Sequence, residues 1–402
     1  MHRPDNILPS PVSAAPLPEV VNHTPWPAQY FQHVDPHGTG FHVMVCRISY
    51  ALDDAGDGSE PPLLPPHDQL PLVEADQFMG EPGLSSTLEE SDFAPYKPRC
   101  DVLLANAVAH APEGRPHARW AVGFGFGEHL RKALTVTGPR PWLGSSWGTP
   151  AAVTEVPLSY ERAAGGPAML ADRLALEQLI DDDATDLPTR RAAQDYLRGW
   201  PEHDPRNPIG CGILQGSGAT AVQRARSLLG RAPLEPLAPQ LATFDSRPED
   251  PLSAAVPGFG PIGRWWQPRL ARAGTHDDHW KATQWPRSPL DHDYRYWNCA
   301  PDDQQVPYPQ GGEMLTLINL APGGGTARFT LPRQELRLLV RLRAGPMVFA
   351  PMNIDTVIVD LASARLSVVR RALVGAAVDV RKLELGTWPV DEPVTPGSSS
   401  PH

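Results

Sequence analysis

The chain has 402 residues, which is enough for one large domain or two of ordinary size. Hydrophobic residues make up 41% and charged residues 20%, as is typical of a soluble globular protein, and no apolar run reaches the roughly 20 residues of a membrane helix. The net charge of −11 argues against a broad nucleic-acid-binding surface, because phosphate binding needs clustered Lys and Arg. The first 18 residues lack the basic and apolar stretches of a secretory signal, so we expect a cytoplasmic protein that binds neither membrane nor nucleic acid.

Two residue types are unusually frequent: 48 Pro and 34 Gly make up about a fifth of the chain, against a typical share of about 12%. Pro interrupts helices and central strands, but the 11 Trp argue against a disordered chain. The composition therefore predicts short strands joined by long, ordered loops. The four Cys, at positions 46, 100, 211 and 299, form no CxxC pair, which argues against a zinc knuckle or a disulfide framework and suits a reducing compartment.

The first part of the chain is predicted to be rich in strands. Period-two alternation predicts strands over 42–50, 102–108 and 120–126, with 132–136 as the hairpin partner of the last. In 120–126 the large rings fall on one face, and Gly123 and Gly125 fall on the other. This bare glycine face predicts that something packs tightly over it. Residues 91–98 are dense in Pro, aromatic and charged side chains, and we expect them to be ordered and buried beside this strand.

A helical insert is predicted over residues 167–230. Helical runs cover 169–180, 189–198 and 219–229, with a glycine after each of the last two. We expect the insert either to cover a sheet edge or to present a partner-specific surface, with part of its apolar area against the β core. Strands then resume at 314–320, 327–331 and 336–342, and a hairpin is predicted from 354–360 and 365–371.

The predicted fold class is mainly β: packed antiparallel sheets, sandwich-like, with long Pro- and Trp-rich loops and a small helical insert. One domain is expected over residues 21–386. Residues 1–20 and 387–402 are rich in Pro and Ser and poor in large apolar groups, so we expect both to be flexible tails.

The densest group of possible metal ligands is His276, Asp277, Asp278 and His279. Adjacent residues on an extended segment point to opposite faces, and the strong signature of two His four apart on a helix is missing. A loop hydrogen-bond network is therefore favoured over a metal site. Nucleotide-binding loops are also missing, because the GxGxG spacing at 123–127 lacks both a following helix and a phosphate-binding Lys. We predict no metal and no cofactor.

A catalytic interpretation has two candidate locations. Residues 291–293 (Asp291, His292 and Asp293) could serve acid–base chemistry, but the chain has no GxSxG turn to supply a nucleophile. Residues Glu89, Glu90 and Asp92 could supply the carboxylate pair of a glycoside hydrolase, although a turn stabilised by Asp92 explains them better. We predict no catalytic residue, and a hydrolase that uses 291–293 or 276–279 stays as the alternative.

The aromatic loops favour a different function, that of a protein-binding surface. Residues 257–261 (PGFGP) and 265–269 (WWQPR) form a glycine-hinged aromatic segment. A single Trp in such a loop most often covers the core, but Trp, Tyr and Arg are also the usual anchors of interfaces. The candidate partner-binding residues are Trp265, Trp280, Trp285, Trp297, Leu197 and Trp200.

Several loop motifs, taken in order, resemble those of a bacterial family of unknown function that is encoded beside type VI secretion spike genes. Residues 90–98 and 101–103 (ESDFAPYKP and DVL) resemble the family's ESDLAPYKPGTDVLV block, 158–166 (LSYERAAGG) its LSYERAFGG, and 207–210 (NPIG) its NPVG. Residues 257–261 and 266–269 are similar to its GFGP and W.PR, 300–304 to AP.DQ, 311–313 to GGE, and 355–360 to its closing DTV..D. The resemblance extends from about residue 22 to about residue 374.

This resemblance implies a protein without catalytic residues. Members look like cytoplasmic adaptors or chaperones that hold a toxic effector, or the PAAR-type tip that carries it, and help to load it onto the VgrG spike. The second alternative is a structural component that leaves the cell with the spike. The residues that match the family's motifs are Glu90, Ser91, Asp92, Pro95, Tyr96, Lys97, Pro98, Tyr160, Glu161, Arg162, Gly165, Gly166, Asn207, Pro208, Gly210, Gly258, Phe259, Gly260, Pro261, Trp266, Pro268, Arg269, Asp303, Gln304, Gly312 and Glu313.

Overall fold

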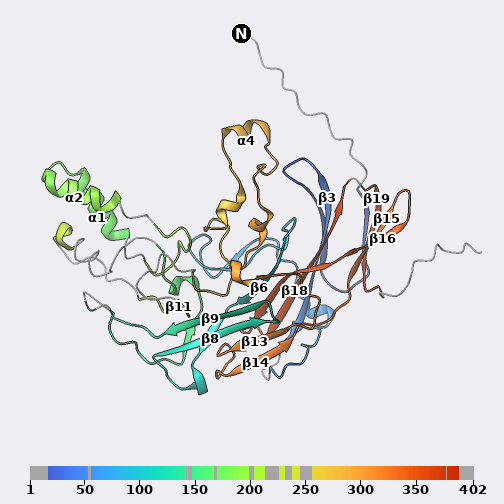
Figure 1. Ribbon diagram of the computed structural model, residues 1–402, viewed down its shortest axis with the longest axis horizontal. Helices are drawn as coiled ribbons and strands as arrows, with labels where there is room; N and C mark the ends of the chain where they lie inside the picture. The colour runs from blue at the N-terminus through green and yellow to red at the C-terminus, as the bar shows by residue number, and fades with distance from the viewer. Residues whose placement is uncertain are drawn as a thin grey trace, which may run out of the picture.

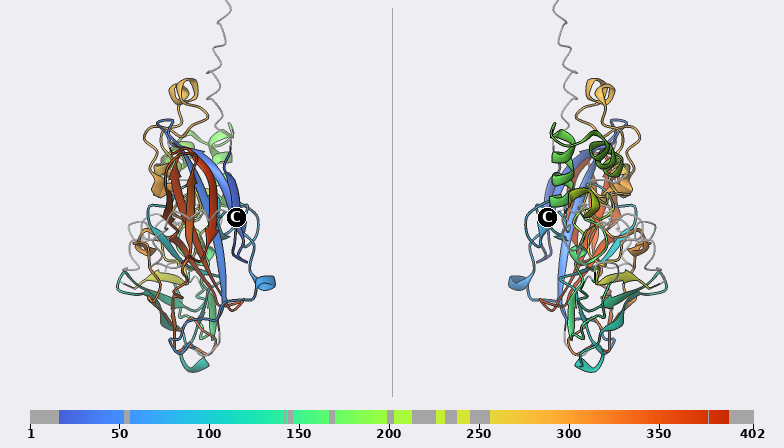
Figure 2. Two further views of the ribbon diagram at one scale, coloured as in Figure 1. Left: turned by 90° about the vertical axis from the view of Figure 1, so that its right-hand side faces the viewer. Right: turned by 90° about the vertical axis from the view of Figure 1, so that its left-hand side faces the viewer.

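Three sheets pack around one core, and two helical projections extend from them (Figures 1 and 2). The computed structural model describes residues 17–52, 56–141, 143, 147–166, 170–198, 203–212, 226–230, 238–244, 256–376 and 378–388. The fold is mainly β, which confirms the predicted class. None of the described helices is long and apolar enough to span a membrane.

The largest sheet has six strands. Nine consecutive residues of β3, 42–50, are buried, because both faces of this central strand are covered. The β6–β17 pair is parallel, and the other neighbouring pairs are antiparallel. The order is β12 (Gln305–Val306), β6 (Cys100–Ala105), β17 (Asn353–Asp360), β18 (Arg365–Gly375), β3 (Gly40–Ala51) and β2 (Ala28–Val34).

The second sheet has five antiparallel strands. Its strands β8 and β9 form the hairpin that the sequence predicts, and the rings of β8 face the core. The order is β11 (Leu241–Thr243), β9 (Leu130–Thr137), β8 (Arg119–Phe126), β13 (Met314–Ile318) and β14 (Thr326–Thr330).

A third sheet joins the two ends of the chain. Its strand β1 pairs in parallel with β19 and begins at Glu19, inside the segment 1–20 that the sequence assigns to a flexible tail, so that boundary was wrong. The order is β1 (Glu19–Asn22), β19 (Val380–Gly386), β15 (Arg337–Leu342) and β16 (Met347–Pro351). Two small sheets pair β10 (Glu155–Pro157) with β7 (Val108–His110), and β4 (Gln77–Phe78) with β5 (Thr87–Glu89).

One hydrophobic cluster includes side chains from all three large sheets. Ile48 of β3, Phe124 of β8 and Leu383 of β19 belong to it and are almost completely buried. Burial of this apolar surface is the main force that holds the sheets together. The predicted strand over 102–108 does not continue through this region, because Asn106 has a φ of 49° and ends β6 at Ala105.

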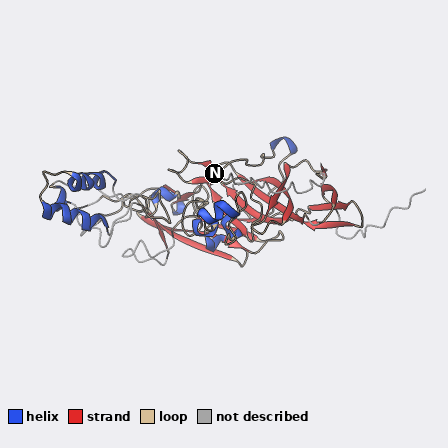
Figure 3. Cartoon of the chain, turned by 90° about the horizontal axis from the view of Figure 1, so that it is seen from above, coloured by secondary structure: helices blue, strands red, loops and turns tan. Residues whose placement is uncertain are grey.

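The helical insert has its own small core. It contains α1 (Leu170–Asp181) and α2 (Leu187–Arg198), and a further helical turn spans 226–229. The buried side chains of Leu176, Ala193 and Tyr196 pack together, with Leu197 against them. This cluster contains only insert residues, so the predicted contact with the β core was wrong for the side chains that the structure describes. Seen from above, the helices lie beyond the end of the sheets (Figure 3).

The second projection is an arm, residues 274–293, that contains α4 (Asp278–Thr283) and extends away from the sheets (Figure 1). Asp277 is the N-cap of α4 and accepts a hydrogen bond of 2.8 Å from the backbone N of Trp280. Sequence periodicity did not predict this helix, because six residues are too few to show a repeat of 3.6.

The separate core of the insert leads to a test. Replacing residues 169–200 with a short Gly/Ser linker should leave a folded β protein, because Leu176, Ala193 and Tyr196 pack on the insert rather than on the sheets. We expect one cooperative thermal transition and unchanged near-ultraviolet circular dichroism from the core aromatics. Loss of the cooperative transition would show that the sheets depend on the insert.

Candidate functional site

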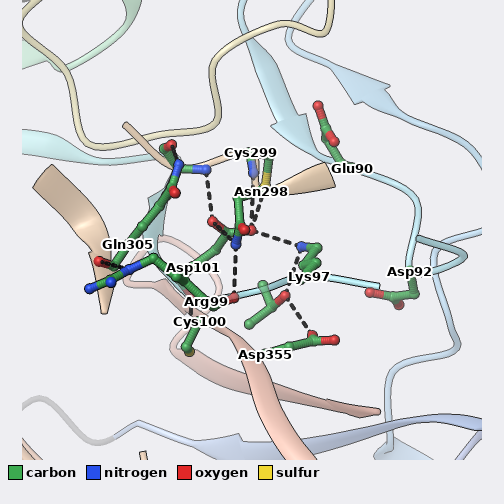
Figure 4. Close-up of polar contacts among 12 residues, drawn as sticks. Glu90, Asp92, Lys97, Arg99, Cys100, Asp101, Asn298, Cys299, Gln305 and Asp355 are labelled. Carbon is green, nitrogen blue, oxygen red and sulfur yellow. Dashed lines mark hydrogen bonds and ion pairs between the residues drawn. The ribbon is translucent and has the colours of Figure 1, made fainter. Parts of the chain in front are cut away.

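The motif loops are held around one buried carboxylate, that of Asp101 on β6 (Figure 4). Asp101 is 0% exposed and accepts hydrogen bonds from the side chain of Asn298 (3.0 Å), from the backbone N of Cys299 (3.0 Å) and from that of Ala300 (3.1 Å). Hydrogen bonds from several N–H groups to one carboxylate are strong, because the acceptor is charged. Asp101 therefore fixes the loop before residues 300–304 against the end of β6.

Lys97 completes this centre. Its Nζ lies 2.9 Å from Asp101 and donates a second hydrogen bond of 2.9 Å to the hydroxyl of Thr356 on β17. Burial alone would lower the pKa of Lys97, but the nearby charges of Asp101 and Asp355 outweigh burial and raise it, so the ammonium keeps its proton. Asp355 in turn pairs with Arg371 of β18 at 2.6 Å. Charges thus link the motif at 90–98 to three strands of the six-stranded sheet.

Residues 91–98 are ordered and largely buried, as predicted, but their neighbours differ from the prediction. Asp92 accepts a hydrogen bond of 2.8 Å from the backbone N of Val73 and lies 3.5 Å from Arg47 of β3. Arg371 of β18 donates to the backbone oxygen of Asp92. The segment is therefore held by β3, β17 and β18 rather than by β8.

A second buried ion pair joins two motifs. Arg269 is 0% exposed, forms a two-nitrogen ion pair with Glu90, and also donates to the backbone oxygens of Ile262 and Tyr296, both at 2.7 Å. Burial opposes its charge, but Glu90 outweighs burial and raises the pKa of Arg269 further. Arg264 approaches the same carboxylate at 3.6 Å. The WWQPR loop is thereby locked onto the strand end at residue 90.

The motif at 158–166 is also structural. The Tyr160 hydroxyl donates to the backbone oxygen of Gly260 (2.8 Å), and its ring packs edge-on to Trp266. A Cβ at Gly258 would lie 2.3 Å from the Tyr160 ring, which explains the glycine there. Glu161 accepts two hydrogen bonds of 2.7 Å from Ser86, and these lower its pKa although burial opposes them.

The NPIG turn closes against the two glycines of the same motif. Asn207 donates to the backbone oxygens of Tyr160 and Ala164, and the backbone N of Gly166 donates to its carbonyl at 2.6 Å. Gly166 has a φ of +86°, and a Cβ there would overlap the carbonyl of Gly210. Only glycine allows this approach. Arg162 bonds Gln240, which places β11 against the motif.

Gln304 belongs to the motif at 300–304. Its side chain donates hydrogen bonds to the backbone oxygens of Val102 on β6 (2.8 Å) and of Phe259 (2.9 Å). Lys132 of β9 donates to Gln304 and pairs with Asp303 at 2.9 Å. Burial lowers the pKa of Lys132, and Asp303 offsets part of that effect. In the motif at 311–313, Gly312 has a φ of +93°, and Glu313 accepts from the backbone N of Gln310.

Five of the candidate catalytic and metal-binding side chains have structural partners: Asp277, which caps α4, and Asp291, Asp293, His292 and His276. Asp291 accepts from Thr275, which lowers its pKa, and Asp293 pairs with Arg295 at 2.6 Å. His292 contacts the Ala273 carbonyl at 3.1 Å, and the His276 ring packs on Trp280. Within the described ranges, no three His, Cys, Asp or Glu side chains come close enough together to hold a metal. Glu89 pairs with Arg47 at 2.7 Å, so Glu89, Glu90 and Asp92 all face arginines.

The candidate partner-binding residues divide into covered and exposed groups. The ring nitrogen of Trp280 donates a hydrogen bond to the backbone oxygen of Arg287. The guanidinium of Arg264 stacks over the ring of Trp297. Trp265 and Trp297 are both half-buried. Trp285 on the arm is 67% exposed. Leu197 packs inside the insert, and Trp200 lies outside the described residues. Trp285 is thus the candidate that best fits an interface anchor.

The motif loops also enclose a cavity of about 340 Å³ that the sequence did not predict. It lies where β9, β11 and the loops at 206, 267–268 and 301–303 meet. Each lining segment looks like an ordinary loop or strand by itself, and the only sequence signal was that several motif blocks border it. The lining residues are Lys132, Arg206, Thr243, Val256, Ile262, Gln267, Pro268, Pro301, Asp302 and Asp303.

Comparison with known families agrees with this arrangement of motif loops. The family described as "Uncharacterized protein conserved in bacteria (DUF2169)" matches residues 37–371, which includes all of the motif loops. The chain belongs to this family. No curated protein and no solved structure matches it. As a DUF2169 protein, the chain has motif residues that build a rigid set of loops, and we call residues 90–101, 158–166, 207–210, 257–269 and 298–304 the motif frame.

The ion pair between Glu90 and Arg269 provides a test of the motif frame. Glu90→Gln should lower the free energy of unfolding by about 3–5 kcal/mol, because the Arg269 guanidinium would stay buried without its counter-charge. Urea denaturation measures the change.

The control is Glu113→Gln, which breaks an exposed pair with Arg115 and should change stability by less than about 1 kcal/mol. Equal effects of the two substitutions would contradict a structural role for the buried pair.

Proposed function

We propose that this protein is a type VI secretion adaptor or chaperone that acts in the cytoplasm. It binds a toxic effector or its PAAR-type tip and helps to load it onto the VgrG spike. The link to type VI secretion comes from the resemblance of the loop motifs. The structural observation that supports protein binding is the position of exposed apolar side chains on the two projections.

Large apolar side chains lie in water on both projections. Trp285 is 67% and Leu290 is 56% exposed on the arm, and Leu187 at the start of α2 is 52% exposed. An exposed Trp is costly in water and is a common centre of protein interfaces. Both projections extend away from the sheets, so a partner can reach them without rearranging the core (Figures 1 and 3).

The motif frame supports the same proposal. Two of its charged pairs are buried and bond within the frame: Glu90 with Arg269 and Lys97 with Asp101. Such residues position loops instead of meeting a substrate. A preorganised frame that carries projecting apolar side chains suits partner recognition, because preorganised loops lose little entropy on binding.

Deletion of the gene from its host provides the test. We expect one neighbouring effector to be lost from the secreted fraction, or degraded in the producer, while the sheath still contracts, because an adaptor serves a cargo and not the machine. Immunoblotting of the effector and imaging of a fluorescent sheath measure the two results.

Complementation with the wild-type gene is the control. Complementation with a gene that lacks residues 169–200 should restore less effector delivery, if the insert contributes to recognition. Unchanged effector level and unchanged killing of prey by the deletion strain would contradict the adaptor function, and loss of sheath contraction would favour a structural spike component.

A further inference from the structure

The outward face of the five-stranded sheet has a hollow of about 530 Å³ over β8, which we call the β8 hollow. Gly123 and Gly125 form its floor. In the register of the sheet, one row across the strands runs Arg131, Gly125, Thr316 and Arg328. The neighbouring row runs Ala133, Gly123, Ile318 and Thr326. The sequence predicts that something packs over this bare face, but the cavity lies open at that place.

The backbone does not require glycine at position 125. Gly125 does not have a positive φ, and a Cβ there would meet its nearest atoms at 3.5 Å (the Leu130 carbonyl) and 3.7 Å (the Thr316 Cβ), which are ordinary contacts. Glycine within a strand costs stability relative to a residue with a side chain. Gly125 therefore weakens the strand without serving its geometry, and its one structural effect is to keep the floor of the β8 hollow open.

The rim of the hollow is basic, although the whole chain carries a net charge of −11. Arg131 is exposed at one end of the Gly125 row, Arg328 is exposed on β14 with Asp57 bridged beside it, and Arg119 is exposed on the same face of β8. Within the described residues, none of these three arginines forms an ion pair, and strands β8, β9, β13 and β14 contain no Asp or Glu. Ile318 and Met314 add exposed apolar surface (43% and 37%).

We propose that the β8 hollow is the docking site for an acidic segment of a protein partner. A bulky apolar side chain of that segment fills the space over Gly125, and flanking carboxylates pair with Arg131 and Arg328. The Cα atoms of these arginines are about 14 Å apart, three strand spacings, so one extended segment can reach both. Bidentate pairs with guanidinium around a central apolar anchor are a common form of tight recognition.

This inference rests on the proposed function, which supplies the partners to be tried. The purified chain is titrated by calorimetry with the three purified proteins that the proposed function assigns to it as partners: the VgrG spike, the PAAR-type tip and the effector. For the protein that binds, Gly125→Leu and Arg131→Glu should each weaken affinity at least about tenfold. Gly125→Ala should give a smaller loss and a melting temperature no lower than the parent's, because the added Cβ fits.

Two matched controls separate the hollow from general effects. Gly375→Leu changes a strand glycine that also has open space around it, and Arg381→Glu reverses a charge exposed on β19; both should leave affinity within about twofold. A Glu→Lys change in the partner's docking segment should restore binding to the Arg131→Glu variant, because the new Lys of the partner can pair with the new Glu at position 131.

The outcomes distinguish the two proposals. If the wild-type chain binds one of the three proteins and Gly125→Leu and Arg131→Glu bind it equally well, the β8 hollow is not the docking site, while the adaptor function stands. If the wild-type chain binds none of the three, the adaptor function fails and this inference fails with it. If the hollow instead binds a single-stranded RNA 20-mer in a manner that Arg131→Glu abolishes, the acidic protein partner is overturned.

Discussion

The buried carboxylate of Asp101 is the interaction on which the loop arrangement depends. Pro-rich loops offer few backbone N–H groups, so they cannot be held by the ladders that hold strands. The carboxylate of Asp101 supplies the acceptors instead: N–H groups of Asn298, Cys299 and Ala300 donate hydrogen bonds to its two oxygens (Figure 4). Because Lys97 bonds both Asp101 and Thr356, the same centre is fixed to β17. A loop region of the chain is thereby attached to the largest sheet by charge.

Buried charges of this kind select one conformation more than they add stability. Replacing a buried pair with apolar groups is often neutral, whereas removing one partner is costly. The pairs Glu90–Arg269, Asp101–Lys97 and Asp355–Arg371 thus penalise every loop arrangement that separates them. These three pairs therefore hold the motif loops in one arrangement. The insert and the arm extend from the sheets and carry the exposed Leu187, Trp285 and Leu290 (Figure 1).

The sequence predicted the elements that repeat along the chain and missed what forms between distant residues. Alternation located β8 and β9, and the helical period located α1 and α2, because both depend on near neighbours. The Asp101 centre joins residues 197 positions apart, which no local pattern reveals. Part of the apolar area of the insert was expected to lie against the β core, but Leu176 packs with Ala193 and Tyr196 within the insert instead. Periodicity shows which face is buried and not what covers it.

The same limit applies to the glycine face of β8, and it bears on how an adaptor could work. Alternating rings and glycines predict a covered face whether the cover is this chain or another, so the sequence could not distinguish the two. An adaptor that passes a cargo to a spike has to hold two proteins at once, and one continuous surface would make them compete. The arm lies at the top and the five-stranded sheet at the bottom of Figure 1; the arm carries the exposed Trp285 and Leu290, and the sheet carries the hollow with Arg131 in its lining. Surfaces so different in position and chemistry can be occupied together, because neither partner must displace the other.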